Sequence, residues 1–211
     1  MSKIKLTGDF GEYWTNPYNE SYPLTLDEMK LNATYIYKAL NSRGWTKNAI
    51  CSFLGNATRE SSLNPGRWQN DTPNNLNLGY GIVQWTPASK YINWVGNNPE
   101  YMDNNLRRID YEAENDIQYI PTSDYPLTLD EFINSNESIE YLTRAWAYNY
   151  ERAGDIAIDE RIYWANYWYL YLTSDIILLK TNFNFIFLNK KKRLKKANNL
   201  INSWLLTSFF I

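Results

Sequence analysis

Apolar residues recur at helical spacing in several short stretches of the chain, and turns rich in Pro, Gly and Asn separate these stretches. Between residues 25 and 44, Met29, Ile36 and Leu40 are seven and four positions apart, so a helix would place them on one face. The same kind of pattern predicts further helices over 46–61, 87–95, 104–120, 138–152 and 159–172. We therefore expect a mostly α-helical domain.

One helix start occurs twice. Residues 22–28 recur residue for residue at 125–131. In each copy a threonine, Thr25 or Thr128, precedes a glutamate by three positions, which is the spacing of a capping box. The identity stops there, so we interpret it as a good helix start used twice and not as a repeat fold.

The segment from Gly55 to Trp85 interrupts the helical pattern. The helix over 46–61 ends beside Glu60, because the sequence Asn64-Pro65-Gly66 cannot continue it. Residues 79–85 then combine two glycines, an apolar pair and an aromatic residue, which is typical of a short extended segment passing close to another part of the chain. We expect a mostly α, α+β arrangement in which one small β-hairpin lines a cleft.

The composition restricts the chemistry. The chain of 211 residues contains no His, which excludes Ser-His-Asp and Cys-His catalysis as well as His-bound zinc. Its single cysteine, Cys51, lies in an apolar helical run and is expected to be a buried thiol. We expect no metal and no cofactor, so acid–base chemistry falls to Asp, Glu, Tyr or Lys. Aromatic residues make up 17% of the chain, which suits carboxylates acting on sugars.

The two ends of the chain differ from its middle. We expect an N-terminal extension over 1–24, a catalytic domain over 25–173 and a tail over 174–211. From residue 175 onward there is no Gly or Pro, and seven Lys or Arg residues stand against one Asp. A membrane-surface segment is one interpretation of this basic and apolar tail. We favour a remnant that packs poorly.

Two motifs carry a resemblance to a known family. The sequence Gly55-Asn56-Ala57-Thr58-Arg59-Glu60-Ser61 and the sequence Gly79-Tyr80-Gly81-Ile82-Val83-Gln84-Trp85-Thr86-Pro87 resemble the phage tail lysozyme family, whose members degrade cell walls at the tail tips of phages, notably short-tailed phages of Gram-positive hosts. The resemblance covers roughly residues 25–172. It implies a lysozyme-like fold, cleavage of the β-1,4 glycan of peptidoglycan while the phage DNA enters the cell, and Glu60 as general acid.

The resemblance also implies a place and partners for the protein. We expect a component of the virion tail tip that acts on the host wall. Its expected partner is peptidoglycan, with other phage tail proteins as a further candidate, and we expect no nucleic acid. No secretory signal is apparent in the sequence, so we expect synthesis in the host cytoplasm without a signal peptide. Membrane contact by the tail stays an open alternative.

Other functions stay open at this point. Glu60-Ser61, residues 81–84 and Ala147-Tyr148-Asn149 are similar, more distantly, to the motifs of lytic transglycosylases, in which the sugar's own hydroxyl attacks after one Glu has released the leaving group. A non-catalytic glycan-binding protein or a membrane-acting tail protein is a further alternative.

Five further residues are candidates for substrate binding: Tyr80, Gln84, Trp85, Tyr150 and Glu151. The aromatic residues are equally at home in a core, and Gln84 could instead tie the backbone across the hairpin. Glu151 or Asp71 could be a second catalytic carboxylate. Glu151 could also pair with Arg152 or Arg161, and Asp71 could be a simple turn residue.

Overall fold

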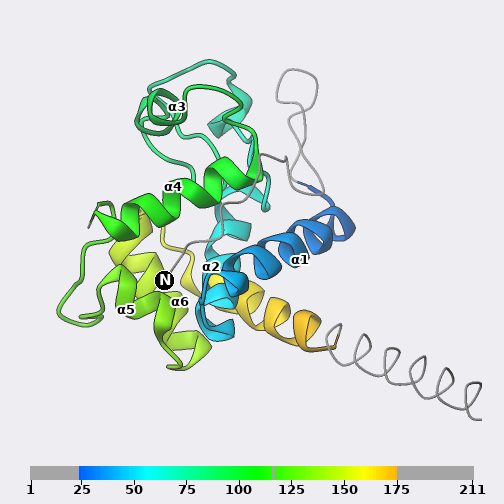
Figure 1. Cartoon of the computed structure of the whole chain (residues 1–211), viewed down its shortest axis with the longest axis vertical. Coiled ribbons are helices and arrows are strands. Elements are labelled where there is room, and N and C mark those ends of the chain that lie inside the picture. The colour runs from blue at the N-terminus through cyan, green and yellow to red at the C-terminus, as the bar shows by residue number, and fades with distance from the viewer. Residues whose placement is uncertain (1–23, 116, 175–211) are drawn as a thin grey trace, which may run out of the picture. The chain divides into compact units, whose positions relative to one another are not determined.

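The computed structural model describes residues 24–115 and 117–174 (Figure 1). The predicted helical class is confirmed, while the expectations for the N-terminal extension and the tail lie outside the described residues, apart from their edges at 24 and 174. The helices are α1 (Leu26–Ser42), α2 (Lys47–Ser61), α3 (Ser89–Val95), α4 (Met102–Glu114), α5 (Leu129–Asn134), α6 (Ile139–Trp146) and a last helix over 158–174; two short turns join them, the 3-10 turn η1 (Gln69–Asp71) and the π-helical turn η2 (Ala147–Glu151).

Both predicted capping boxes are present. The Thr25 side chain accepts a hydrogen bond from the Glu28 amide, and the Glu28 carboxylate accepts one from the Thr25 amide at 2.7 Å. Thr128 and Glu131 repeat this exchange at the start of α5. Each box satisfies backbone donors that a helix start would otherwise leave without partners.

Two helices differ from their predicted extents. The stretch predicted over 104–120 forms α4, which begins at Met102 and ends at Glu114. The stretch predicted over 138–152 is an α-helix only as far as Trp146, and its last residues widen into the π-helical turn η2. Periodicity locates a helix well but does not show where the backbone changes its hydrogen-bond spacing.

The expected β-hairpin is not confirmed, and no strand occurs in the parts of the chain that the structure describes. Tyr80 and Trp85 exchange two backbone hydrogen bonds of 3.2 and 2.9 Å, which form one isolated bridge. The ladder does not extend, because the neighbouring carbonyl of Gly79 accepts from the Gln69 amide and that of Leu78 accepts from the Ala88 amide.

Helix α2 forms the centre of the core, with α1, α5 and α6 packed against it (Figure 1). The rings of Trp45, Phe53, Phe132 and Trp146 meet beside it at centroid distances of 5.1–6.4 Å. Cys51 of α2 is fully buried, as predicted, and burial raises the pKa of its thiol to about 12. The thiol is therefore un-ionised at neutral pH and acts as a small apolar group.

A close approach brings the last helix against α2. A Cβ atom at Gly55 would lie 2.5 Å from the carbonyl oxygen of Arg161 and 2.7 Å from the Cβ of Ala165, so only glycine fits this contact. Near the other end of the contact, the Trp168 indole donates a 2.8 Å hydrogen bond to the Thr58 hydroxyl. The described residues up to 169 belong to one structural unit, and residues 170–174 belong to a second, C-terminal unit.

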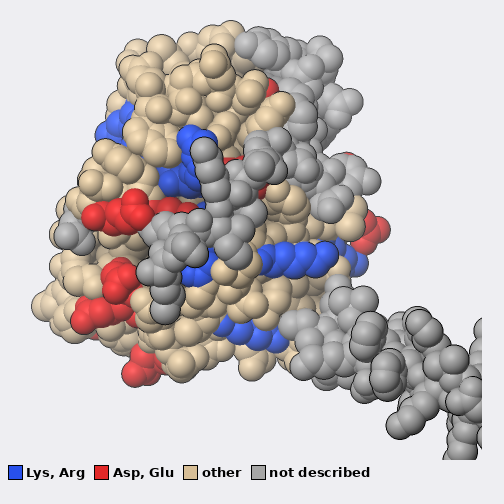
Figure 2. Space-filling view, viewed as in Figure 1, with Lys and Arg blue, Asp and Glu red and all other residues tan. Residues whose placement is uncertain are grey.

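Within the described ranges, no helix has both the length and the apolar character needed to cross a bilayer. Figure 2 shows that charged side chains gather on the part of the visible face around α4 and below it, whereas the part built around α3 is mostly uncharged.

Candidate active site

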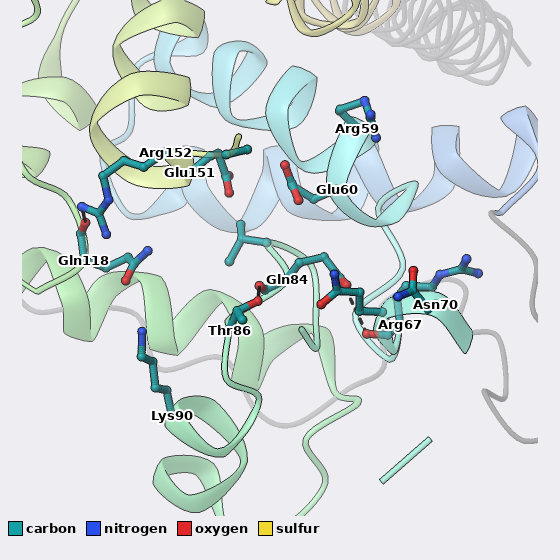
Figure 3. Close-up of a pocket in the computed structure, with 13 residues that line it drawn as sticks. Arg59, Glu60, Arg67, Asn70, Gln84, Thr86, Lys90, Gln118, Glu151 and Arg152 are labelled. Atoms are coloured by element: carbon teal, nitrogen blue, oxygen red, sulfur yellow. Dashed lines mark hydrogen bonds between the residues drawn. The ribbon is translucent and has the colours of Figure 1, made fainter. Parts of the chain in front are cut away.

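A pocket of about 560 Å³ opens between the end of α2, the turn after Gly79, and η2 (Figure 3). Charged and polar side chains dominate its wall. The lining residues are Arg59, Glu60, Arg67, Gln69, Asn70, Val83, Gln84, Thr86, Lys90, Gln118, Glu151, Arg152 and Ala153.

Glu60 reaches this pocket from the last turn of α2. The chain leaves the helix sharply, because Ser62 and Leu63 adopt left-handed backbone angles with φ values of 53° and 59°. The Ser61 hydroxyl donates a 2.8 Å hydrogen bond to the carbonyl of Ile82, which fastens the helix end to the glycine-containing turn. The two sequence motifs that predicted the site are therefore joined at this point.

Arg161 holds the Glu60 carboxylate. Its guanidinium is fully buried and donates to Glu60 Oε1, to Asn56 Oδ1 at 3.1 Å, and to the Ile156 carbonyl at 2.7 Å. The Glu60 side chain keeps 19% of its surface exposed, so the carboxyl group still faces the pocket. Arg161 thus neutralises the Glu60 carboxylate from the side that faces the protein interior, and it fixes the orientation of this group.

Glu151 approaches the same pocket from the opposite wall. It ends η2, whose last bond runs from the Arg152 amide to the Ala147 carbonyl at 3.0 Å and spans five residues. This wide turn lets the Trp146 indole donate a 2.8 Å hydrogen bond to Glu151 Oε1. Figure 3 shows the carboxyl groups of Glu60 and Glu151 pointing toward one another. Turns of this type occur frequently at functional sites.

The electrostatic surroundings favour the protonated form of Glu151. Burial raises the pKa of Glu151 well above its ordinary value, and the charge of Glu60 raises it further. Arg161 and the hydrogen bond from Trp146 act in the opposite direction. The ion pairs between Glu151 and Arg152 or Arg161 that the sequence left open are not formed, because Arg161 pairs with Glu60 and Arg152 donates to backbone carbonyls.

Gln84 lies in the pocket wall and also ties the backbone. Its amide nitrogen donates to the carbonyls of Arg67 and Gly81 at 3.0 and 2.9 Å. The structure thus supports the backbone role that the sequence left open, and it also places the residue where a ligand would touch it.

Tyr80, Trp85 and Tyr150 do not line the pocket, so the expectation that their rings contact substrate directly is not supported by the geometry. Their exposed fractions are 3%, 3% and 1%. Tyr80 and Trp85 pack against Tyr91 at ring distances of 5.9 and 4.4 Å, and Tyr150 stacks on Trp146 at 4.5 Å. These aromatic residues build the floor behind the site, because burying large rings against one another is more favourable than exposing them.

Sequence reasoning missed Glu112, a buried carboxyl on α4. It accepts hydrogen bonds from Arg108 Nε, Trp85 Nε1 and the Tyr150 hydroxyl at 2.8, 3.0 and 2.5 Å. Burial raises the pKa of Glu112, although these three donors oppose the shift. The group fastens the turn that carries Trp85 to the η2 residue that precedes Glu151. The four-residue spacing from Arg108 was the one signal available in the sequence.

Four cationic side chains line the pocket together with the two carboxyl groups. Arg59 and Arg67 form ion pairs with Glu160 and Asp71, at 3.0 and 2.9 Å. Asp71 itself does not line the pocket, which leaves Glu151 as the second carboxyl there. The remaining cations are Lys90 and Arg152. Nothing in the sequence pattern distinguished these residues from ordinary surface charges.

The described residues contain no cluster of three or more His, Cys, Asp or Glu side chains that could hold a metal ion.

Two facing carboxyl groups in a polar pocket are the arrangement that glycosidases use. The chain belongs to the phage tail lysozyme family, whose sequence model matches residues 31–172. It is also similar to "Morphogenesis protein 1" of Bacillus phage B103, with 43% identity over 160 residues, which cover 74% of this chain. The aligned region spans 43% of that relative's length. The resemblance inferred from the motifs is thus confirmed.

Proposed function

We propose that this protein is a tail-associated phage glycosidase that cleaves the β-1,4 glycan strand of peptidoglycan and opens the wall while the phage DNA enters the cell. The observation that supports it best is the pair formed by Glu60 and Glu151, which face each other in one pocket. Glycoside cleavage needs one group that protonates the leaving oxygen and another that assists attack at the sugar carbon.

Glu60 is the proposed proton donor at the scissile bond. It lies at the junction of the two family motifs, and its carboxyl is both exposed to the pocket and fixed by Arg161. Gln84 lies in the wall beside the turn and is proposed to orient a sugar. Tyr80, Trp85 and Tyr150 contribute by shaping the site from behind.

The surroundings of the pair suit a wall polymer. Peptidoglycan and the polymers attached to it carry carboxylates and phosphates. Arg59 and Arg67 are ion-paired with Glu160 and Asp71, but Lys90 and Arg152 add positive charge to the pocket wall, which attracts an acidic polymer and raises its local concentration. The proposed location is the tail tip of the virion, where the protein would meet the wall and neighbouring tail proteins.

Wall lysis by purified protein tests the proposal. Glu60→Gln removes the carboxyl group that delivers the proton to the glycosidic oxygen, and we expect lysis per folded molecule to fall by about a hundred- to ten-thousand-fold. Glu60→Asp keeps the charge opposite Arg161 but withdraws the carboxyl by one methylene, and it should also lose most activity. Glu140→Gln is the matched control, because it removes an exposed carboxylate whose partner Arg144 does not line the pocket, and it should stay near wild type. Folded Glu60→Gln with wild-type lysis would exclude Glu60 from the mechanism.

Mass spectrometry of the digested wall identifies the reaction. A reducing muramic acid end is expected for hydrolysis, whereas an anhydro end would show the lytic transglycosylase alternative on the same bond. Intact glycan together with retained binding would support a non-catalytic tail protein instead. Dye release from anionic vesicles without wall cleavage would support the membrane-acting alternative.

A further inference from the structure

The two carboxyl groups of the pocket have different partners. Glu60 accepts from the buried guanidinium of Arg161, which carries a full positive charge. Glu151 accepts from the neutral indole of Trp146 at 2.8 Å. Glu60 therefore has a cationic partner, whereas Glu151 has an uncharged hydrogen-bond donor.

We propose that Glu151 holds the catalytic proton of the resting site and passes it to Glu60, so that the two facing carboxyl groups work as one proton-carrying pair. This proposal rests on the glycosidase function proposed above. Among the alternatives that the sequence left open for Glu151, it favours the second catalytic carboxylate over a substrate-binding or bracing role, and it assigns that carboxylate the proton of the resting site.

The charges around Glu151 support this assignment. Burial and the charge of Glu60 raise the pKa of Glu151, and Glu112 on α4 adds in the same direction. Arg161 from the last helix opposes them, as does Trp146 within α6. Tyr150 beside it stays neutral, because burial and nearby carboxylates raise the pKa of its hydroxyl well above 10.0. Two carboxyl groups that share one site do not both ionise easily, and the group without a cationic partner keeps the proton.

One turnover returns both carboxyl groups to their starting protonation states. The proton of Glu151 moves to Glu60 and from there to the glycosidic oxygen, while the C1–O bond breaks and leaves its electron pair on that oxygen. The attacking hydroxyl, from water or from the sugar itself, forms the new bond to C1 and gives its proton to ionised Glu151. Glu60 is then again a carboxylate on Arg161, and Glu151 is again protonated.

The pH dependence of wall lysis tests the pair. In Glu151→Gln, a proton on Glu60 must displace its ion pair with Arg161. We therefore expect lysis at pH 7 to fall by about tenfold or more, and the alkaline limb of the rate profile to move by about one pH unit or more toward acid. Glu140→Gln, which makes the same Glu-to-Gln change at an exposed position outside the pocket, should keep the wild-type profile.

A titration that does not depend on activity supplies the second test. Carbon-13 carboxyl shifts of Glu151 should titrate above 4.5, its ordinary value, in the wild-type protein. They should titrate at a lower pH in Glu60→Gln, because the neighbouring negative charge is gone.

The outcomes separate this inference from the proposed function. An active Glu151→Gln with an unmoved pH profile, or a Glu151 carboxyl that titrates at its ordinary value, would overturn the pair but leave Glu60 catalysis standing. Wild-type protein that cleaves no glycan would instead remove the proposed function. If Glu151→Gln does not fold, the titration of wild type and Glu60→Gln still decides the question.

Discussion

Arg161 and Glu60 form an ion pair that joins the last helix to the end of α2. The guanidinium is almost wholly buried, with 1% of its side-chain surface exposed, whereas the carboxylate opens onto the pocket. The same guanidinium also binds Asn56 and the Ile156 carbonyl. One residue therefore contributes both to the packing of two helices and to the orientation of a proposed catalytic group.

Replacing Arg161 should destabilise the fold. Arg161→Met leaves Glu60 without its cation and two oxygen acceptors without a donor, and breaking a buried pair in this way costs about 3–5 kcal/mol. For a domain of this size, each kcal/mol lowers the melting temperature by roughly 2–4 °C. Thermal melts measure the effect.

The double variant Arg161→Met with Glu60→Gln separates the contribution of the ion pair from that of the other contacts of Arg161. Since no uncompensated charge is left in it, the double variant should lose less stability than the two single variants added together. Strict additivity would show that the pair contributes nothing to the fold.

Gly55→Ala should separate the last helix from α2. The added Cβ would lie 2.5 Å from the carbonyl of Arg161, and that backbone atom cannot rotate away. We expect a loss of about 1–3 kcal/mol or more, with reduced lysis per folded molecule because Arg161 no longer reaches Glu60. Gly154→Ala is the matched control: its Cβ would meet nothing within 4 Å, and we expect a change within about 0.5 kcal/mol.

The positions of the helices could be predicted because periodicity and capping residues act locally. Thr25 and Glu28 satisfy each other across three residues, whatever the rest of the chain does. The hairpin could not be predicted in the same way. Whether Tyr80 and Trp85 start a ladder depends on the partners of Gly79 and Leu78, and these come from other segments.

The candidate site divides in the same way into residues that stand in local motifs and contacts that join distant segments. Glu60 stands in one local motif and Gln84 in the next, and both predicted residues line the pocket. The partnership of Arg161 with Glu60 spans 101 residues and becomes visible only in three dimensions. The sequence also does not show which rings are covered by neighbours. Trp85, for example, stacks on Tyr91 and lies outside the pocket lining.

Lys90 should contribute to the attraction of the acidic wall polymer. It lines the pocket and is exposed, so its loss should not affect folding. We expect Lys90→Gln to raise the substrate concentration needed for half-maximal lysis while leaving the maximal rate nearly unchanged. The difference from wild type should shrink at high salt, because screening removes long-range attraction.

Lys38→Gln is the control for this effect, since it removes the same charge from an exposed position on α1 outside the pocket. Equal effects of Lys38→Gln and Lys90→Gln would mean that overall charge matters and the pocket does not.

The stability of the fold should fall as the pH rises, and Glu151 should account for part of the loss. A carboxyl whose pKa is raised by folding binds its proton more tightly in the folded state than in the unfolded state. Its contribution is therefore fully present below the ordinary value of 4.5 and is lost as the pH rises through the raised pKa. Each unit by which the pKa is raised corresponds to about 1.4 kcal/mol.

Glu151→Gln removes this penalty, because the amide never ionises. We expect the variant to unfold at about the same denaturant concentration as wild type at pH 4 and at a higher one at pH 8. Glu112 has a pKa shift of the same sign, but it is present in both proteins, so the difference between them isolates Glu151. Glu140→Gln, which breaks only an exposed pair with Arg144, should change stability by about 1 kcal/mol or less at either pH. A Glu151→Gln variant that is less stable than wild type at pH 8 would show that the ionised carboxylate braces the fold.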